Sequence, residues 1–137
     1  MILGVGIDII EVARIHAAVE RLGERFLDRI LTPGEKEYCA TFANPAPHWA
    51  ARFAAKEAVS KAFGTGVGAH LAWKEVEVAR RASGQPYVIL HSGGQRLLEG
   101  LGGKQLHLSL SHTQQYAAAV ATLEGPGLPG ARCRETR

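Results

Sequence analysis

The sequence predicts an α+β fold in which a small antiparallel sheet packs around one long central helix. Three observations support this prediction. One apolar strand stands first, a group of helical segments follows it, and two hairpin-like strand pairs come last. A chain that keeps its helices apart from its paired strands in this way favours α+β over an alternating, parallel α/β sheet.

The first strand and the short helices after it are predicted by residue spacing. Residues 2–10 are apolar and rich in β-branched side chains, as in a buried strand. Residues 11–22 repeat apolar side chains at helical spacing, and a second helical piece covers 26–31. Thr32 as cap and Glu35 as its partner in a capping box predict the start of a third helix, which runs to about residue 42.

The longest helix is predicted over residues 49–63, which are alanine-rich and contain neither glycine nor proline. Residues 44–47 (NPAP) are expected to break the chain before it. Gly64 and Gly66 are expected to end the helix.

The C-terminal half is predicted to form two strand pairs and a short helix. Val76 and Val78 alternate with glutamates, which predicts a strand with one face in water. The expected elements are a strand at 73–79 and its return at 87–90, a helix at 95–101, and strands at 106–110 and 116–123. Residues 1–123 are therefore assigned to one domain and 124–137 to a flexible tail rich in glycine and proline.

Composition excludes several classes of protein. The chain has 137 residues, of which 46% are hydrophobic and 21% charged, as in an ordinary globular domain. Its net charge of +3 is too small to indicate nucleic-acid binding but suits an anionic ligand or an acidic partner. Residues 1–10 are too short for a membrane span, which needs roughly 20 apolar residues, and lack a basic leader. Cys39 and Cys133 have no metal-ligand spacing and are expected to be free thiols, as in a reducing compartment. The thiols and the short N-terminal apolar run together predict a cytoplasmic protein with no membrane partner.

Several catalytic and nucleotide-binding motifs are absent. The Gly4–Gly6 pair lacks the third glycine of a dinucleotide fingerprint, because position 9 is Ile9. His107, Ser109 and Ser111 share one face of a predicted strand, but no strained GxSxG elbow accompanies them. We interpret them as polar residues on an exposed strand face.

Asp8 stands in an apolar run. A buried carboxylate there costs several kcal/mol on order-of-magnitude terms unless it is paired or bound to an ion. The alternative is that Asp8 simply caps the helix that begins near Glu11.

Glu57 and Lys61 are four residues apart, so they share one face of the long helix. They could be an ordinary surface pair, worth roughly 0.2–0.5 kcal/mol. Their small apolar neighbours instead indicate a closely packed helix, and Arg52 and Lys56 on an adjoining stripe would place three cations around one carboxylate. Together with Asp8, Glu57 could hold Mg²⁺ while the lysines balance the charge of a phosphate ester.

Arg14, Arg21 and Arg25 are spaced seven and four residues apart, so a continuous helix would align them. The alternatives are a solvated charged face and a dock for an acidic partner helix.

Three segments together resemble the bacterial holo-(acyl carrier protein) synthases, which are phosphopantetheinyl transferases. They are GVGIDIIEVARI (residues 4–15), RFAAKEAVSKAFGTG (52–66) and LSLSHTQQYAAAVA (108–121). The resemblance implies a small α+β enzyme that transfers 4′-phosphopantetheine from coenzyme A to a serine of acyl carrier protein and releases 3′,5′-ADP. It also implies a homotrimer with active sites between protomers.

The resemblance also assigns residues. Asp8 and Glu57 match the positions that bind Mg²⁺, and Lys61 matches the lysine that contacts the coenzyme phosphates. Glu57, or a water that it holds, could accept the serine proton. Arg52, Gly64, Thr65 and His112 match further coenzyme-binding positions, and Arg14, Arg21 and the neighbouring Arg25 are expected to meet the carrier protein.

One departure and two rival functions accompany the resemblance. Family members often carry basic residues where this chain has residues 44–49 (NPAPHW), so Arg52 or His48 is expected to bind the coenzyme's 3′-phosphate. A metal-dependent phosphohydrolase could use the same Asp8 and Glu57, and a small basic binding module could hold both carboxylates for structure alone. Metal binding separates the module from both enzymes, and dependence on an acceptor separates the transferase from the hydrolase.

Overall fold

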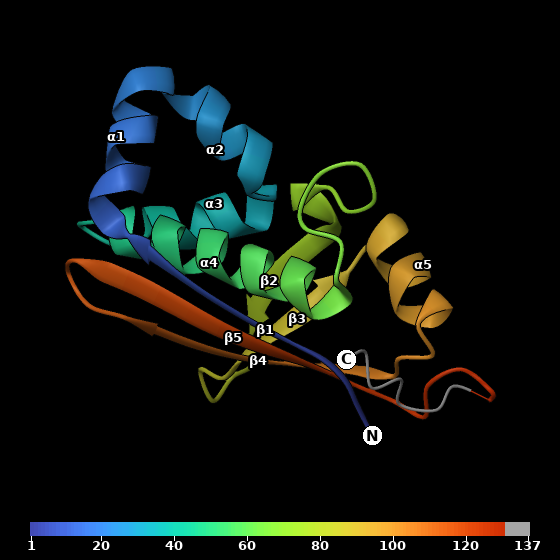
Figure 1. The fold of residues 1–137 in the computed structure, drawn as a ribbon. Coiled ribbons are helices and arrows are strands. Elements are labelled where there is room, and N and C mark those ends of the chain that lie inside the picture. Colours follow the sequence, from blue (N-terminus) through green and yellow to red (C-terminus); the bar gives the residue numbers. More distant parts are fainter. Residues whose placement is uncertain (131–137) are drawn as a thin grey trace.

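The computed structural model of the chain describes residues 1–130, and these form an α+β domain (Figure 1). The elements are β1 (Ile2–Glu11), α1 (Val12–Leu22), α2 (Glu24–Ile30), α3 (Pro33–Ala40), α4 (Ala46–Phe63), the 3-10 turn η1 (Trp73–Glu75), β2 (Val76–Arg80), β3 (Pro86–Leu90), α5 (Gly93–Gly100), β4 (Gln105–His112) and β5 (Tyr116–Glu124). The predicted fold class is therefore confirmed.

The strands form two antiparallel sheets. β1, β5 and β4 pair in that order, and β2 pairs with β3. Both predicted hairpin-like pairs are thus present. The pairing of β1 with β5 joins the two ends of the domain and places Asp8 opposite Ala119.

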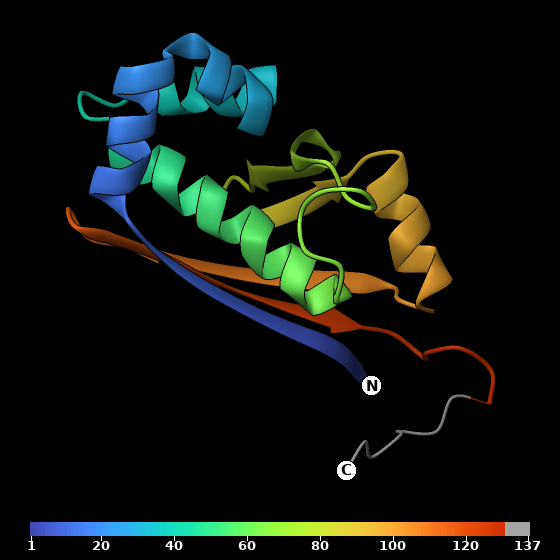
Figure 2. The same ribbon diagram turned by 45° about the horizontal axis from the view of Figure 1, so that its top comes forward.

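Helix α4 lies across one face of the three-stranded sheet and packs on β1 and β5 (Figure 2). Two glycines make this contact possible. A Cβ atom on Gly4 would collide with the backbone oxygen of Ala62, and one on Gly6 with that of Ala58. The missing side chains therefore let the strand touch the helix backbone, which fixes Asp8 beside α4.

The opposite face of this sheet is not covered by any element within residues 1–130 (Figure 2). Val5, Ile7 and Ile9 point outward there, with exposed fractions of 58%, 67% and 67%. Val120, directly opposite Ile7 in the register, belongs to the same face.

The helix boundaries agree with most of the local signals. Thr32 and Glu35 form the predicted capping box at the start of α3, and Gly64 ends α4 in a left-handed conformation. The predicted break before the long helix is present but ends earlier than expected, because Pro45 is the N-cap of α4 and the helix begins at Ala46. Proline is compatible with a first helical turn, since the N–H it lacks has no partner there. The predicted strand at 73–79 is shorter than expected, since residues 73–75 form η1.

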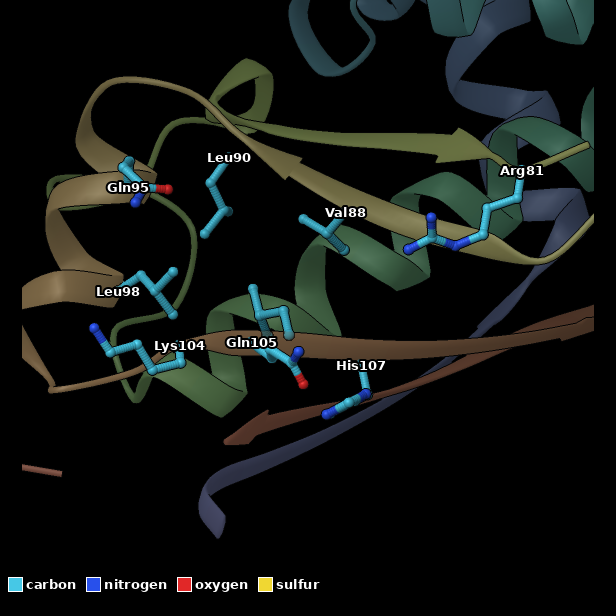
Figure 3. A pocket seen from close by; sticks show the side chains of 9 residues that line it. Arg81, Val88, Leu90, Gln95, Leu98, Lys104, Gln105 and His107 are labelled. Atoms are coloured by element: carbon cyan, nitrogen blue, oxygen red, sulfur yellow. The ribbon is translucent and has the colours of Figure 1, made fainter. Parts of the chain in front are cut away.

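A hollow of about 340 Å³ lies between part of β3 and one end of β4 (Figure 3). Val88 and Leu90 of β3 face it from one side and residues 105–107 of β4 from the other, while Leu98 of α5 lies beside it. This hollow is at the end of β4 that pairs with residues 122–124, whereas Asp8 aligns with Ala119 and Leu110.

The predicted tail begins inside the fold. Glu124 is the last residue of β5, and Gly125 exchanges two hydrogen bonds with Met1. Gly127 donates a further one to the Gly102 oxygen at 3.1 Å. The rest of the predicted tail, residues 131–137, lies outside the described residues.

Candidate active site at the β1–α4 contact

Asp8, Glu57 and Lys61 meet where β1 crosses α4. The Lys61 ammonium donates to the Ile7 backbone oxygen at 2.9 Å and to Asp8 Oδ1 at 3.2 Å. The Asp8 side chain is 17% exposed and that of Lys61 is 52% exposed. The shielded Asp8 carboxylate therefore forms an ion pair with a lysine that also reaches solvent. Two residues that are 53 positions apart in the sequence thus form one polar cluster.

The alternative role of Asp8 as a helix cap is wrong. Helix α1 begins at Val12 with Glu11 at the N-cap, and no side chain makes a capping hydrogen bond there. Asp8 instead follows Gly6 on the strand face that packs against α4.

Glu57 is the second carboxylate of the cluster. Partial burial raises its pKa above the ordinary glutamate value, the negative charge of Asp8 raises it further, and the positive charge of Lys61 opposes both effects. Two partly shielded carboxylates repel each other, and a hard cation bound between their oxygens would reduce this repulsion.

The Asp8–Glu57 pair suits a Mg²⁺ ion that takes only a few of its ligands from the protein. Within residues 1–130, no group of three or more His, Cys, Asp or Glu side chains is arranged to hold a metal ion. Magnesium commonly takes one or two carboxylates and completes its shell with substrate phosphates and water, so the Asp8–Glu57 pair matches that mode.

Gly64 and Thr65 follow Lys61 by three and four residues, at the C-terminal end of α4. The Gly64 N–H donates to the Lys61 oxygen at 3.0 Å, and the Thr65 hydroxyl donates to the Gly66 oxygen at 2.9 Å. These two predicted coenzyme contacts are therefore on the same end of the helix as Lys61.

The expected ring of three cations around Glu57 is wrong. Lys56 is fully buried and forms an ion pair with Glu35, with 2.7 Å between Nζ and Oε1. Arg52 is only 1% exposed, and its guanidinium carbon lies 4.4 Å from the centre of the Tyr38 ring. Adjoining stripes of a helix face different neighbours, so these two side chains point away from Glu57 into the layer formed by α2, α3 and β2.

His112 belongs to a second group of polar and aromatic side chains at the far edge of the sheet. Its ring lies 5.0 Å from that of His48, which stacks on Phe42 at 3.6 Å. Arg52 joins this group through a long contact of 3.5 Å from its Nη1 to the His48 oxygen. Burial, followed by the charges of His112 and the arginines, lowers the pKa of His48.

This second group and Asp8 lie at opposite edges of the same sheet. Asp8 is on β1 and His112 on β4, which are the two edges of the sheet, with β5 between them. The sequence motifs named Arg52, His48 and His112. They gave no signal for Tyr38, for Phe42 or for Arg80, whose guanidinium carbon lies 5.4 Å from the centre of the Tyr38 ring. The structure thus collects the predicted coenzyme residues in two places, and the role of each stays a prediction.

Arg14 and Arg21 line a hollow of about 360 Å³ between α1, α2 and α4. Its other walls are apolar and include Phe26 and Phe53. The expected alignment of Arg25 with these two arginines is wrong, because the helix ends at Gly23, whose φ is +67°. Arg25 lies on α2 and is not among the residues that line the hollow.

The polar side chains of β4 have the predicted arrangement. His107, Ser109 and Ser111 are exposed, whereas the leucines that alternate with them are partly buried. No helix within residues 1–130 is long and apolar enough to cross a membrane.

The fold and the β1–α4 cluster define a class of protein, a small α+β enzyme with a carboxylate pair and a lysine suited to a phosphate ester. A family model described as the 4′-phosphopantetheinyl transferase superfamily matches residues 4–121. The chain therefore belongs to this superfamily and is a phosphopantetheinyl transferase.

Individual relatives agree with the family. A holo-[acyl-carrier-protein] synthase of Koribacter versatilis is 51% identical over 124 residues, which cover 90% of this chain and 99% of the relative. The enzyme of the same name from Chlamydia trachomatis is 53% identical over 121 residues, which cover 88% and 98% of the two chains.

Solved structures give the same result for the fold. Holo-[acyl-carrier-protein] synthase from Neisseria meningitidis superimposes with a TM-score of 0.85 at 33% identity, over 90% of this chain and 99% of that one. The Helicobacter pylori enzyme, in complex with coenzyme A, gives 0.79 at 31% identity over 88% and 99%. The resemblance inferred from three segments is therefore confirmed.

Proposed function

We propose that this enzyme transfers 4′-phosphopantetheine from coenzyme A to a serine of apo acyl carrier protein, releases 3′,5′-ADP and works in the cytoplasm. The observation that carries the proposal is the meeting of Asp8, Glu57 and Lys61 in a chain of this family. The names of its relatives and their complex with coenzyme A support the choice of donor and acceptor.

Asp8 and Glu57 would hold Mg²⁺, and Lys61 would contact the phosphates. When bound, the ion would neutralise charge on the pyrophosphate oxygens as the phosphorus–oxygen bond breaks. The half-exposed Lys61 ammonium can turn from Asp8 toward a phosphate oxygen and stabilise the charge that develops there.

The transfer exchanges one phosphorus–oxygen bond for another. The carrier serine oxygen forms a bond to the phosphorus nearest the pantetheine, and the bond to 3′,5′-ADP breaks. The serine proton goes to the Glu57 carboxylate or to a water that it holds. A pKa raised by burial makes Glu57 a stronger base than an ordinary glutamate.

The carrier protein would dock over the hollow between α1 and α2. Arg14 and Arg21 offer positive charge at a place whose walls are apolar. An acidic amphipathic helix supplies the complementary surface, with carboxylates for the arginines and an apolar side chain for the hollow.

Assembly into a trimer would complete the site. The uncovered apolar face of β1 and β5 needs a partner surface, and large exposed apolar patches mark interaction sites. The predicted coenzyme residues of one chain lie in two groups, one beside Asp8 on β1 and one beside His112 on β4, which are opposite edges of the sheet. A neighbouring protomer could bring its His112 group to the Asp8 cluster, so that each site uses both groups.

Intact mass of an apo carrier protein tests the function. After incubation with enzyme, coenzyme A and Mg²⁺, the carrier should gain one phosphopantetheine, and a carrier whose acceptor serine is alanine should gain none. Unchanged mass across several metals and carriers would contradict the proposal. Loss of coenzyme A without modified carrier would instead indicate the phosphohydrolase, and failure to bind metal would indicate the binding module.

A further inference from the structure

Lys56 is the residue before Glu57, and it is held in a single position. Its side chain is completely buried, and its ammonium donates to the Ile30 oxygen at 2.6 Å, to Glu35 Oε1 at 2.7 Å and to the Trp73 oxygen at 3.1 Å. A lysine has three N–H donors, so all of them are used.

Glu35 is equally constrained. Its Oε1 also accepts from the Thr32 N–H at 2.8 Å, and its Oε2 accepts from the Val78 N–H at 2.9 Å. The ion pair therefore ties α4 to the end of α2, the start of α3, η1 and β2. Burying such a pair brings little net stability, because desolvation offsets the attraction between the charges.

On this side helix α4 has few other large side chains that could set its rotation: Arg52 lies against the Tyr38 ring, and Phe53 stacks on Trp73. The buried residues of α4 are mostly alanines and lie nearly all around the helix axis. Alanines on several sides bury similar area in many orientations, so they contribute little to the choice of rotation. On the β1 side, contact with Gly4 and Gly6 sets how close the helix lies.

Rotation of α4 decides where Glu57 points. Successive residues of an α-helix are about 100° apart, so a Lys56 that points into the α2–α3–β2 layer directs Glu57 toward the β1 side. Lys61, four residues later, follows on the same face and reaches Asp8. A small rotation would move both side chains away from Asp8.

We propose that the buried Lys56–Glu35 pair is a positioning device that sets the rotation of α4 and so holds Glu57 and Lys61 opposite Asp8. This inference rests on the proposed function of these three residues. Lys56 acts through Glu57 and touches neither the metal nor the substrate.

Lys56→Met tests the proposal, because methionine keeps much of the apolar stem and removes all three donors. Two quantities are measured. The first is the affinity for Mn²⁺ in the presence of coenzyme A and the absence of carrier protein, determined by electron paramagnetic resonance. The second is the midpoint temperature of thermal unfolding. We expect the Mn²⁺ affinity to fall by about 10–100-fold, as for residues that orient metal ligands. In transfer assays, kcat should fall while the KM for the carrier stays unchanged.

Two further variants separate positioning from stability. Lys56→Met combined with Glu35→Gln leaves no unpaired buried charge, so we expect its thermal midpoint to recover while Mn²⁺ affinity does not. Lys36→Met makes the same change at a partly exposed lysine that joins α3 to Asp28 and Glu24 of α2, and it should leave Mn²⁺ affinity unchanged.

The outcomes are distinct. A folded double variant that binds Mn²⁺ as tightly as the wild type would overturn the proposal. Failure of both Lys56 variants to fold would also overturn it, because the ion pair would then be required for the fold itself. A wild-type protein that binds no Mn²⁺ with coenzyme A and transfers nothing would contradict the proposed function instead.

Discussion

At the scale of single residues, the site depends on two carboxylates that the fold forces together. Asp8 is shielded, Glu57 is partly buried, and the pKa of Glu57 is raised. Such an arrangement costs free energy in the absence of a ligand, and functional sites often carry that cost.

Replacing either carboxylate with its amide should remove activity without unfolding the protein. Asp8→Asn and Glu57→Gln keep side-chain size, and each would remove one anionic ligand from the proposed Mg²⁺ site. Turnover should fall by orders of magnitude at limiting Mg²⁺, and the double variant should cost little more than the worse single variant because the two act together. Near-normal turnover of Asp8→Asn would take Asp8 out of the metal site.

The raised pKa of Glu57 also predicts a pH-dependent effect on stability. Because the folded state disfavours ionised Glu57, this residue destabilises the fold above its raised pKa, and the cost disappears as pH falls through it. With chelator present, Glu57→Gln should therefore unfold at a higher temperature than wild type at neutral pH. The difference should vanish in acid. Thermal scans from pH 4 to 8 measure it, and a difference independent of pH would contradict this assignment.

At the scale of elements, contact between β1 and α4 builds the candidate active site, and glycine makes this contact possible. Gly4 and Gly6 lie against the backbone oxygens of Ala62 and Ala58. The same glycines would suggest a nucleotide loop in a different fold, but here they allow a strand to approach a helix closely.

Gly6→Ala should separate the strand from the helix. Its Cβ would meet backbone atoms of Ala58 and Ala62, which cannot turn aside as a side chain can. Overpacking of this kind costs about 1–3 kcal/mol, measured by denaturant unfolding, and should weaken Mg²⁺ activation because Asp8 moves. Gly34→Ala is the control, since its Cβ would meet only a Glu77 side-chain oxygen at 3.4 Å, and it should be nearly silent.

The break between α1 and α2 gives a test of carrier docking. Arg14 lines the apolar hollow, whereas Arg25 lies on the next helix and does not. Arg14→Glu should raise the KM for the carrier and leave the KM for coenzyme A nearly unchanged. The effect should shrink as salt is added, because attraction between exposed charges is screened over a distance of about 8 Å at physiological ionic strength. Arg25→Glu should have a smaller effect. Equal losses for both substrates in Arg14→Glu would mean that Arg14 supports the fold.

At the scale of the whole molecule, the uncovered sheet face and the division of the predicted coenzyme residues into two groups both favour the proposed assembly. Val5, Ile7 and Ile9 are more than half exposed on one side of β1, while Asp8 is held on the other side. The strand that would form an interface therefore also carries Asp8 of the proposed catalytic cluster.

Light scattering should give three chains per particle. Ile7→Asp places a charge in the middle of the exposed apolar face and should dissociate the particle and abolish transfer, if sites are shared. Leu101→Asp changes an exposed leucine at the end of α5 and should leave the assembly intact. A wild-type monomer with full activity would count against shared sites.

The sequence by itself determined the features that depend on near neighbours. The capping box of Thr32 and Glu35, the glycine end of α4 and the strand alternation of residues 106–110 were all predicted and are present. Asp8, Glu57 and Lys61 could be named because their motifs resemble a known family.

Only the tertiary structure decided which residues meet. The pairing of β1 with β5, the direction of Lys56 toward Glu35 and the placement of His112 across the sheet from Asp8 join segments far apart in the sequence. Helical spacing placed Lys56 near Glu57, but it could not show which neighbour each side chain faces. That choice is made by long-range packing, in which glycine contacts on one side of α4 and a buried ion pair on the other fix the helix in place.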